Sequence, residues 1–329
     1  MTSSSPSPTT PAVASDTSDR EIVTVRLIRA PRALVFRAFI DPEQVVKWWG
    51  PNGFTSTISE MDVRPGGNWR FIMHGPDGTD YTNNCIYREI VEPERLVYDH
   101  ASTPKFTAVI TFEDVNGDTL LTSRSILESA EIRVMVVEKF GAVAGAEQHL
   151  SRLERHMAFL GREEILTITR EFDAPRDLVW KVWSEPAHLS QWWGPKGFDV
   201  KIAAMDFQSG GRCLYTMQLP DGDVWWGKFE YREISAPTRL TWLNSFSDPE
   251  GGTTRHPLWE QGPLEILNDV KLTESGGKTT VTLRAVPFNA TVEERASFNS
   301  MHSSMEQGYG GTMDQLADYL ASLKETTQS

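Results

Sequence analysis

The sequence predicts two tandem α+β domains, each a curved antiparallel sheet wrapped on a long C-terminal helix, with two short helices after the first strand. Three observations predict this fold class. The chain repeats itself at a constant offset, each copy separates strand-sized segments by turn residues, and each copy ends in a long amphipathic pattern. A repeat this long has the size of a complete domain rather than of a solenoid unit.

The repeat has no gap over its first half. Each position from Thr24 to Leu96 faces the position 144 residues later, and roughly four positions in ten are identical, far above chance. The shared motifs are Ala30-Pro31-Arg32 with Ala174-Pro175-Arg176, Trp48-Trp49-Gly50-Pro51 with Trp192-Trp193-Gly194-Pro195, Met61-Asp62 with Met205-Asp206, Gly66-Gly67 with Gly210-Gly211, and Pro76-Asp77-Gly78 with Pro220-Asp221-Gly222.

The first copy begins with an alternating strand, residues 21–29. Pro31 then opens a short helix, and a second begins at Asp41-Pro42 and ends before Gly50-Pro51, a typical helix stop. Six strands follow, near residues 54–63, 68–74, 81–91, 95–101, 106–115 and 119–127. Turns are expected at Gly66-Gly67, Asp77-Gly78 and Asn116-Gly117-Asp118, because such residues adopt positive φ readily.

Each copy closes with a predicted long helix. In the first copy it spans residues 130–160, with one continuous apolar stripe at spacings of three, four or seven. The second copy repeats the order from Glu164 but adds an extra segment, roughly residues 247–262, after which the offset becomes 160. Its closing helix carries Phe298, Met301, Met305, Tyr309, Thr312, Leu316, Tyr319 and Leu323 at the same spacing.

These patterns divide the chain into three parts. Residues 1–20 read as a disordered Ser/Thr/Pro-rich tail, residues 21–161 as the first domain and residues 162–325 as the second. Gly161-Arg162 is nearly the whole linker, so the two domains are expected to bury a surface between them.

Charge and composition exclude several functions. The net charge is −13 with no run of Lys or Arg, which argues against nucleic acid and anionic membranes as partners.

No signal peptide precedes the first domain, which suggests a cytoplasmic protein. The chain is expected to be a monomer or a weak homodimer. Cys85 and Cys213 are expected to be buried thiols. No metal-ligand spacing and no cofactor motif is found.

The predicted architecture leaves room for a small-molecule cavity. A twisted sheet separates from a long helix over part of its length, and an aromatic lining makes such a gap a binding site. Solid core packing is the alternative. The candidate lining residues are Trp69, Phe71, Met73, Tyr81, Tyr98 and Phe106 in the first copy, and Tyr215, Met217, Trp225, Trp226, Trp242, Met305 and Tyr309 in the second. One Trp of each Trp-Trp pair should face the cavity mouth, with Trp48 and Trp192 as candidates.

The motifs, together with the Glu306–Met313 segment, resemble bacterial proteins related to the C-terminal domain of the Hsp90 ATPase activator. These belong to the START-like (SRPBCC, Bet v 1-like) superfamily, which has the helix-grip fold. The resemblance covers nearly everything after residue 20, twice, and implies a hydrophobic cavity between sheet and helix. It implies no catalytic set, because members include binders, cyclases and co-chaperone domains. Differences between the copies suggest two diverged pockets.

A few polar residues are candidates for chemistry. His100 could act as a general base or bind a ligand, although a histidine satisfied by its neighbours is the more frequent case. His256 lies in the extra segment, which is either a lid or an ordinary loop. Arg255 beside it could hold a carboxylate or phosphate, and Trp259 follows closely.

Three functions remain open from sequence. The first is binding of a small hydrophobic or amphipathic molecule in each domain. The second is an enzyme of cyclase, dehydratase or hydrolase type that acts on an aromatic or polyketide-like substrate through His100 or His256. The third is a co-chaperone-like interaction module, which would show an exposed docking face.

Overall fold

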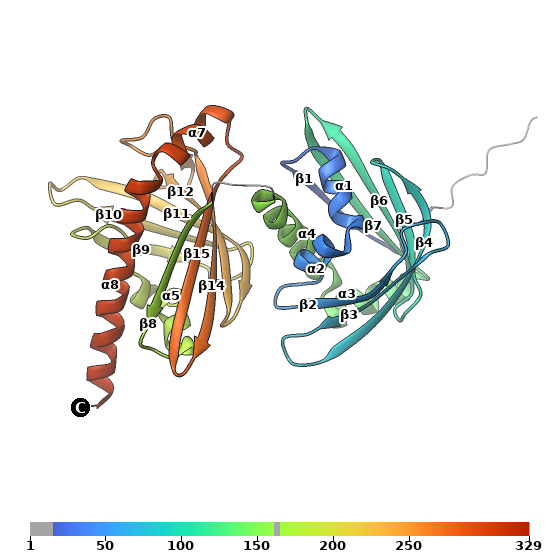
Figure 1. The fold of residues 1–329 in the computed structure, drawn as a ribbon, viewed down its shortest axis with the longest axis horizontal. Helices are drawn as coiled ribbons and strands as arrows, with labels where there is room; N and C mark the ends of the chain where they lie inside the picture. The colour runs from blue at the N-terminus through green and yellow to red at the C-terminus, as the bar shows by residue number, and fades with distance from the viewer. Residues whose placement is uncertain (1–15, 161–164, 329) are drawn as a thin grey trace, which may run out of the picture.

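The computed structural model describes residues 16–160 and 165–328 (Figure 1). The first domain contains β1 (Glu21–Ile28), α1 (Arg32–Ile40), α2 (Pro42–Trp48), β2 (Thr55–Met61), β3 (Asn68–His74), β4 (Asp80–Val91), β5 (Arg95–His100), β6 (Phe106–Val115), β7 (Asp118–Leu127), α3 (Ala130–Phe140) and α4 (Ala142–Phe159).

The second domain repeats this order with one short additional strand. It contains β8 (Leu166–Phe172), α5 (Arg176–Ser184), α6 (Pro186–Leu189), β9 (Asp199–Met205), β10 (Arg212–Gln218), β11 (Val224–Ser235), β12 (Arg239–Ser247), β13 (Thr253–Thr254), β14 (Glu265–Ser275), β15 (Lys278–Phe288), α7 (Val292–Ser300) and α8 (His302–Gln328).

Both sheets are antiparallel and have the same topology. Their strand orders are β1-β7-β6-β5-β4-β3-β2 and β8-β15-β14-β12-β11-β10-β9, with β13 paired to β12. The predicted turns are confirmed between β2 and β3, β3 and β4, and β6 and β7, where Asn116 takes a positive φ of 57°. Each domain is therefore the predicted α+β unit, a curved sheet with helices on its inner face.

The short helices are held by the sequence signals that predicted them. The Asp41 side chain caps α2 by accepting the backbone N–H of Glu43, which satisfies a helix N-terminal donor. The Trp48 indole then donates to the carbonyl of Ala38 at 3.0 Å and joins α2 to α1. Trp192 makes the same bond to Val182 at 3.0 Å in the second domain.

The prediction of one continuous closing helix per domain is wrong in both. The first breaks at Gly141, whose φ of 60° ends α3 before α4 begins, as glycine commonly ends helices. The second breaks at Met301, which ends α7 before α8. The apolar pattern of the sequence runs on through both breaks, but Phe140 and Val143 beside the first break are 70% and 44% exposed and do not pack on the sheet.

The N-terminal tail was predicted to reach residue 20, and its first 15 residues lie outside the described part of the chain. Residues just before β1 are ordered. Arg124 donates to the Thr17 hydroxyl at 3.5 Å, and the Leu127 amide donates to the Arg20 carbonyl at 3.0 Å. The tail prediction is thus too long at its C-terminal end. The predicted linker, Gly161-Arg162, also lies outside the described residues.

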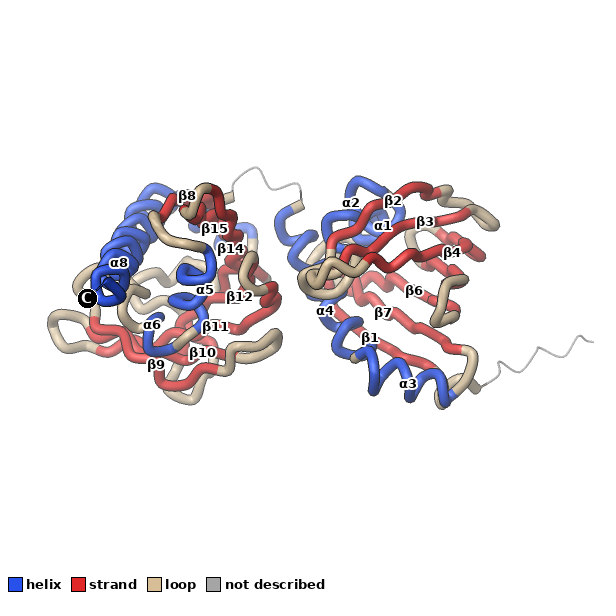
Figure 2. The backbone as a smooth tube through the Cα atoms, turned by 90° about the horizontal axis from the view of Figure 1, so that it is seen from below, coloured by secondary structure: helices blue, strands red, loops and turns tan. Residues whose placement is uncertain are grey.

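Helix α4 lies between the two domains (Figures 1 and 2). One face of the helix, with Leu150, Leu153 and Met157, belongs to the core of the first domain. Near its C-terminus, Ala158 and Phe159 pack on an apolar cluster on the second sheet. That cluster consists of Leu243, Leu267, Val286 and Phe288.

A buried ion pair accompanies this contact. Arg155 of α4 donates to Glu233 of β11, and both side chains are about 5% exposed. Ser235 donates to the other carboxylate oxygen of Glu233 at 3.1 Å. The Arg284 guanidinium lies 4.5 Å from the centre of the Phe159 ring. The buried inter-domain surface expected from the short linker is therefore present.

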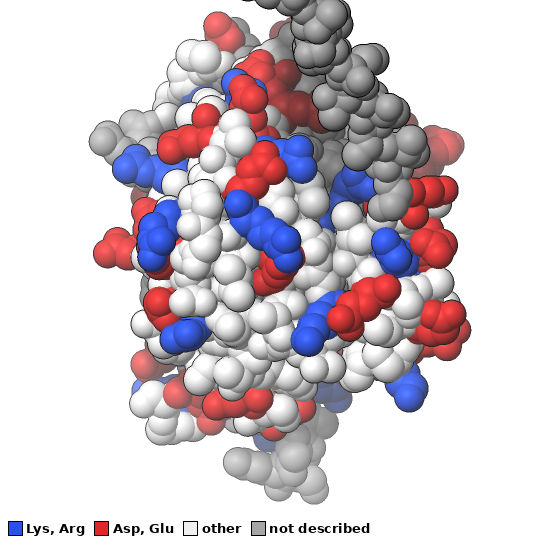
Figure 3. All heavy atoms as spheres, turned by 90° about the vertical axis from the view of Figure 1, so that its right-hand side faces the viewer, with Lys and Arg blue, Asp and Glu red and all other residues white. Residues whose placement is uncertain are grey.

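Three further features of the described residues bear on function. Within residues 16–160 and 165–328, no helix combines the length and the hydropathy needed to cross a membrane. On the end of the first domain shown in Figure 3, acidic and basic side chains are interspersed. Cys85 and Cys213 are buried free thiols, as predicted, and burial raises the pKa of each to about 12.

Candidate functional site

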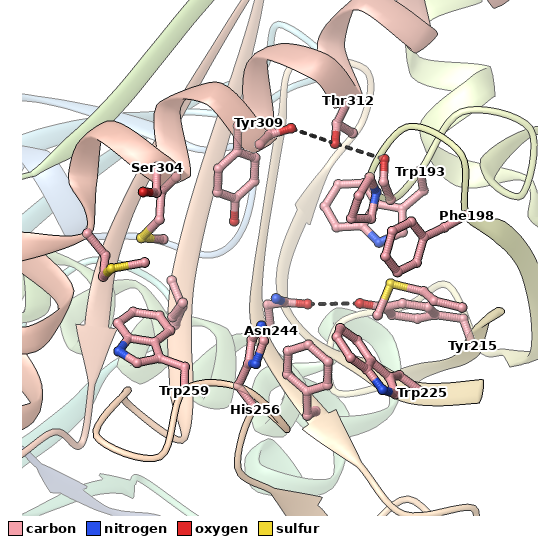
Figure 4. Close-up of a pocket in the computed structure, with 18 residues that line it drawn as sticks. Trp193, Phe198, Tyr215, Trp225, Asn244, His256, Trp259, Ser304, Tyr309 and Thr312 are labelled. Atoms are coloured by element: carbon pink, nitrogen blue, oxygen red, sulfur yellow. Dashed lines mark hydrogen bonds between the residues drawn. The ribbon is translucent and has the colours of Figure 1, made fainter. Parts of the chain in front are cut away.

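A cavity of about 320 Å³ lies in the second domain between α8 and the inner face of the sheet (Figure 4). This volume is near the lower end of the range of small-molecule sites, ~300–1,000 Å³. It is lined by Trp193, Gly194, Pro195, Phe198, Tyr215, Met217, Trp225, Asn244, Phe246, His256, Trp259, Ile266, Met301, Ser304, Met305, Gly308, Tyr309 and Thr312. The lining is mainly aromatic, with thioethers from Met217, Met301 and Met305.

The two tyrosines of the cavity are neutral donors. Tyr215 donates to the side-chain carbonyl of Asn244 at 3.3 Å, and Tyr309 donates to that of Asn268 at 3.2 Å. Burial raises the pKa of both phenols well above the ordinary value, so they stay protonated near neutral pH. None of the lining residues in the described chain is Asp, Glu, Lys or Arg.

His256 is the one imidazole that faces this cavity among the described residues. Its ring is 4.5 Å from Phe246 and 5.6 Å from Trp225. The backbone N–H of Leu258 donates to its Nδ1 at 3.0 Å. Burial lowers its pKa, so the ring is neutral near pH 7. Since Nδ1 accepts, Nε2 carries the proton.

The extra segment of the second copy (residues 247–262) forms one side of the cavity mouth. Trp259 lines the cavity, and its indole donates to Ser297 of α7 at 2.8 Å. Arg255 forms an ion pair with Glu294 of α7 at 2.8 Å and donates to the Gly262 carbonyl at 2.7 Å. The segment is thus fastened to α7 by two polar contacts.

Six candidates from the second copy lie at this cavity. They are Tyr215, Met217, His256, Trp259, Met305 and Tyr309. Trp225, one of two adjacent candidates, also lines it. The structure thus brings together residues from β10, β11, α8 and the extra segment.

Four other candidates do not line the cavity. Trp192 and Trp242 are fully buried in the core, and Trp193 takes the position at the cavity that was expected of Trp192. Trp226 lies on the other face of β11, opposite Ser247. The Arg255 guanidinium pairs with Glu294 and donates to the Gly262 carbonyl, so it does not face the cavity.

The candidate aromatics of the first domain mostly pack on one another. Trp48, Trp69, Phe71 and Tyr98 are at most 4% exposed and belong to the hydrophobic core. The Trp69 ring lies 4.5 Å from Trp49 and 4.5 Å from Phe71. Tyr81 is 44% exposed, at the end of the β3–β4 hairpin. For these four buried residues the core alternative holds.

His100 has a protein neighbour at each ring nitrogen. Its two ring nitrogens lie 2.9 Å from the Pro104 carbonyl and 2.9 Å from the Asn83 side-chain oxygen. The ring stacks on Phe106 at 4.6 Å, and burial lowers its pKa. Each ring nitrogen already has a protein oxygen within hydrogen-bond distance, so neither is open toward a ligand.

The closing helices explain why the two domains differ. Where α8 has Gly308 and Thr312, the equivalent positions of α4, at the offset of 160, have Gln148 and Arg152. The Gln148 side-chain oxygen accepts the backbone N–H of Asn52 at 3.1 Å, and the Arg152 guanidinium donates to the Gly50 carbonyl at 2.8 Å. These long side chains tie α4 to the loop after α2. In the second domain Thr312 still bonds Gly194 at 3.0 Å, but Gly308 leaves the cavity open beside it.

Several cavity residues were missed from sequence. Phe198 and Gly194-Pro195 belong to a repeated motif and could have been found, since the motif directly follows the Trp pair. Asn244, Phe246, Ile266, Ser304 and Thr312 carry no local signal, because only the pairing of β12 with β14 and the packing of α8 place them there.

Comparison with known proteins places the chain in a family. The model of the Activator of Hsp90 ATPase homolog 1-like family matches residues 29–158 and again residues 173–321. No curated protein matches the sequence. Among solved structures, it resembles the solution structure of a protein from Arthrobacter aurescens, with 29% identity, 48% of this chain and 87% of that chain covered, and a TM-score of 0.42.

Two further solved structures are similar to it. Protein Ms6760 from Mycobacterium smegmatis has 25% identity, with 49% of this chain and 92% of that chain covered and a TM-score of 0.39. The di-domain ARO/CYC BexL from the BE-7585A biosynthetic pathway has 14% identity, with 92% and 98% covered and a TM-score of 0.38. Since the family model covers most of the sequence in two tandem regions, the chain belongs to the Activator of Hsp90 ATPase homolog 1-like family.

Proposed function

We propose that the second domain binds a small uncharged aromatic molecule in the cavity under α8. The observation that carries this proposal is the lining, which combines aromatic rings and thioethers with neutral hydrogen-bonding groups. An ionised ligand would lose its hydration there without gaining a countercharge. An aromatic ligand gains from both burial and ring contacts.

The first domain is outside this proposal. Its helix carries Gln148 and Arg152 where the cavity of the second domain has Gly308 and Thr312, and both long side chains bond the facing loop. We therefore expect one ligand per chain rather than one per domain.

Binding without turnover is favoured over acid–base catalysis. A catalytic imidazole usually has one nitrogen oriented by a carboxylate so that the other is free to accept a proton. In His256 the Nδ1 atom is held by a backbone N–H, so Nε2 carries the proton and donates. Such a ring recognises a ligand but is a poor general base.

The test uses the glycine that distinguishes the two helices. A Cβ built at Gly308 meets nothing within 4 Å, so Gly308→Gln should fold and place the long side chain of the first domain into the cavity. We expect N-phenyl-1-naphthylamine, a neutral fluorescent aromatic probe, to bind the unmodified chain at one site. The variant should bind it at least tenfold more weakly.

Gly311→Gln is the matched control. It lies on the same helix, also has nothing within 4 Å of an added Cβ, and does not line the cavity. Its affinity for the probe should be unchanged. Equal loss in both variants, equal binding in both, or no saturable binding by the unmodified chain would contradict the proposal.

A further inference from the structure

One side of the cavity presents hydrogen-bond donors without partners. The Asn244 carbonyl oxygen accepts the Tyr215 hydroxyl at 3.3 Å. With the carbonyl oxygen occupied by this bond, the amide presents its Nδ2 group. Its Nδ2 group has no hydrogen-bond partner among the described residues, and Figure 4 shows the side chain in the cavity.

His256 supplies a second donor to the same region. With Nδ1 occupied by the Leu258 amide, its Nε2–H is free of any protein partner in the described chain. Phe246 connects the two groups, because it lies two positions from Asn244 on the same face of β12, about 7 Å away. Its ring is 4.5 Å from the His256 ring. Both donors thus line one wall of the cavity.

The first domain shows the contrast. At the offset of 144, the residue equivalent to Asn244 is His100, and each of its ring nitrogens lies 2.9 Å from a protein oxygen. The second domain leaves its donors unpaired at the same place in the fold. A carbonyl oxygen that enters the cavity leaves its hydration behind, and these partly exposed donors offer it a hydrogen bond in exchange.

From this arrangement we infer that the ligand is a neutral, planar aromatic carbonyl compound whose oxygen accepts a hydrogen bond from Asn244 Nδ2, from His256 Nε2, or from both. This inference rests on the proposed function and adds the chemical class of the ligand. The rings would lie among Trp193, Phe198 and Trp225, with the carbonyl directed at the donor wall.

A matched pair of probes tests the inference. 9-Fluorenone and fluorene are rigid tricyclic molecules that differ only in having C=O or CH₂ at one position. Each is titrated against the full chain, with binding read from quenching of tryptophan fluorescence and from displacement of N-phenyl-1-naphthylamine. We expect fluorenone to bind at least tenfold more tightly, although fluorene is the more hydrophobic of the two.

Two variants identify the source of the preference. Asn244→Leu and His256→Phe each remove one donor and keep a similar volume. Within each variant the two affinities are compared as a ratio, so that a general change of the cavity cancels, and the preference for fluorenone over fluorene should fall at least fivefold in one or both. If a variant fails to fold, the other still tests the wall to which the carbonyl is directed.

The outcomes separate the two proposals. Equal binding of fluorene and fluorenone by the unmodified chain would overturn the inference and leave the proposed aromatic site standing. A preference that survives in both variants would also overturn it, because the donors would then lie elsewhere. No binding of either probe, nor of the naphthylamine, would overturn the proposed function itself.

Discussion

His149, on α4, makes the first domain sensitive to acid. Its ring lies 4.3 Å from the Trp49 ring, and its Nε2 accepts the backbone N–H of Gly50 at 3.3 Å. Burial, with Arg152 nearby, lowers the pKa of His149 to about 3. Protonation of Nε2 would break the bond to Gly50 and place a charge beside Arg152, so the folded state holds the ring neutral.

The stability of the protein should therefore fall on acidification. The unfolded chain takes up this proton near pH 6.5, the ordinary histidine value, whereas the folded state resists it down to about pH 3. The free energy of unfolding should be highest above pH 6.5 and should decline below it by at most ~1.4 kcal/mol per pH unit, the limit for the uptake of one proton. Urea unfolding from pH 7 to 4 measures the slope.

His149→Phe gives the comparison. This variant keeps an aromatic ring and loses the titrating group, so its free energy of unfolding should depend less on pH. At pH 7 the value should be lower than that of the unmodified chain, because the hydrogen bond from the Gly50 N–H is lost. His156, whose burial lowers its pKa to about 4, would retain part of the slope. Parallel curves for the variant and the unmodified chain would show that His149 does not carry the effect.

Single residues were the hardest feature to predict from sequence. Trp225 and Trp226 are adjacent and equally apolar, so alternation cannot tell which faces inward. The structure decides through the pairing of β10 with β11, which sets Trp225 opposite Met217 and Trp226 opposite Thr216. The same holds for Trp192 and Trp193, since only the indole bond to Val182 shows which one packs inside.

At the scale of the elements, the sequence predicted most of the strands, turns and short helices. Repetition provided an independent check of each one, and glycine or Asn-Gly turns marked the hairpins. The breaks in the closing helices escaped because the apolar stripe continues through Gly141 and Met301. The spacing of apolar residues alone does not show a break, and it also does not show that Phe140 and Val143 are exposed.

The glycines of α8 are expected to lower its stability. Gly310 and Gly311 lie in the interior of the helix, and an added Cβ meets nothing within 4 Å at either position. Alanine should therefore stabilise the helix by up to ~1 kcal/mol at each site. Thermal unfolding of Gly310→Ala and Gly311→Ala should show higher midpoints. Lower midpoints would mean that the helix needs the flexibility of glycine for packing.

At the scale of the whole molecule, the ion pair of Arg155 and Glu233 joins the two domains. The pair is buried, so its loss on one side leaves a charge without a partner. Arg155→Ala should lower the free energy of unfolding by ~3–5 kcal/mol. The apolar double variant Arg155→Met/Glu233→Leu should recover most of that loss, since it leaves no unpaired charge.

A surface pair provides the reference. Lys278 and Glu171 lie 3.1 Å apart and are both about half exposed, so Lys278→Ala should cost far less than Arg155→Ala. Denaturant unfolding of all three variants measures the free energy that each one loses. If Arg155→Ala costs no more than Lys278→Ala, the pair does not hold the domains together.

The position of α4 also means that the two copies can no longer be separated into independent domains. A lone domain of this kind must keep the back of its sheet compatible with water, but here Leu243, Leu267, Val286 and Phe288 rest under a helix that belongs to the other copy. A fragment that begins after α4 would expose these residues to water. A fragment that begins before α4 would remove Leu150, Leu153 and Met157 from the core of the first copy. The two copies therefore form one folding unit. The second copy can change its cavity in evolution only while the first copy keeps α4 packed on the back of the second sheet.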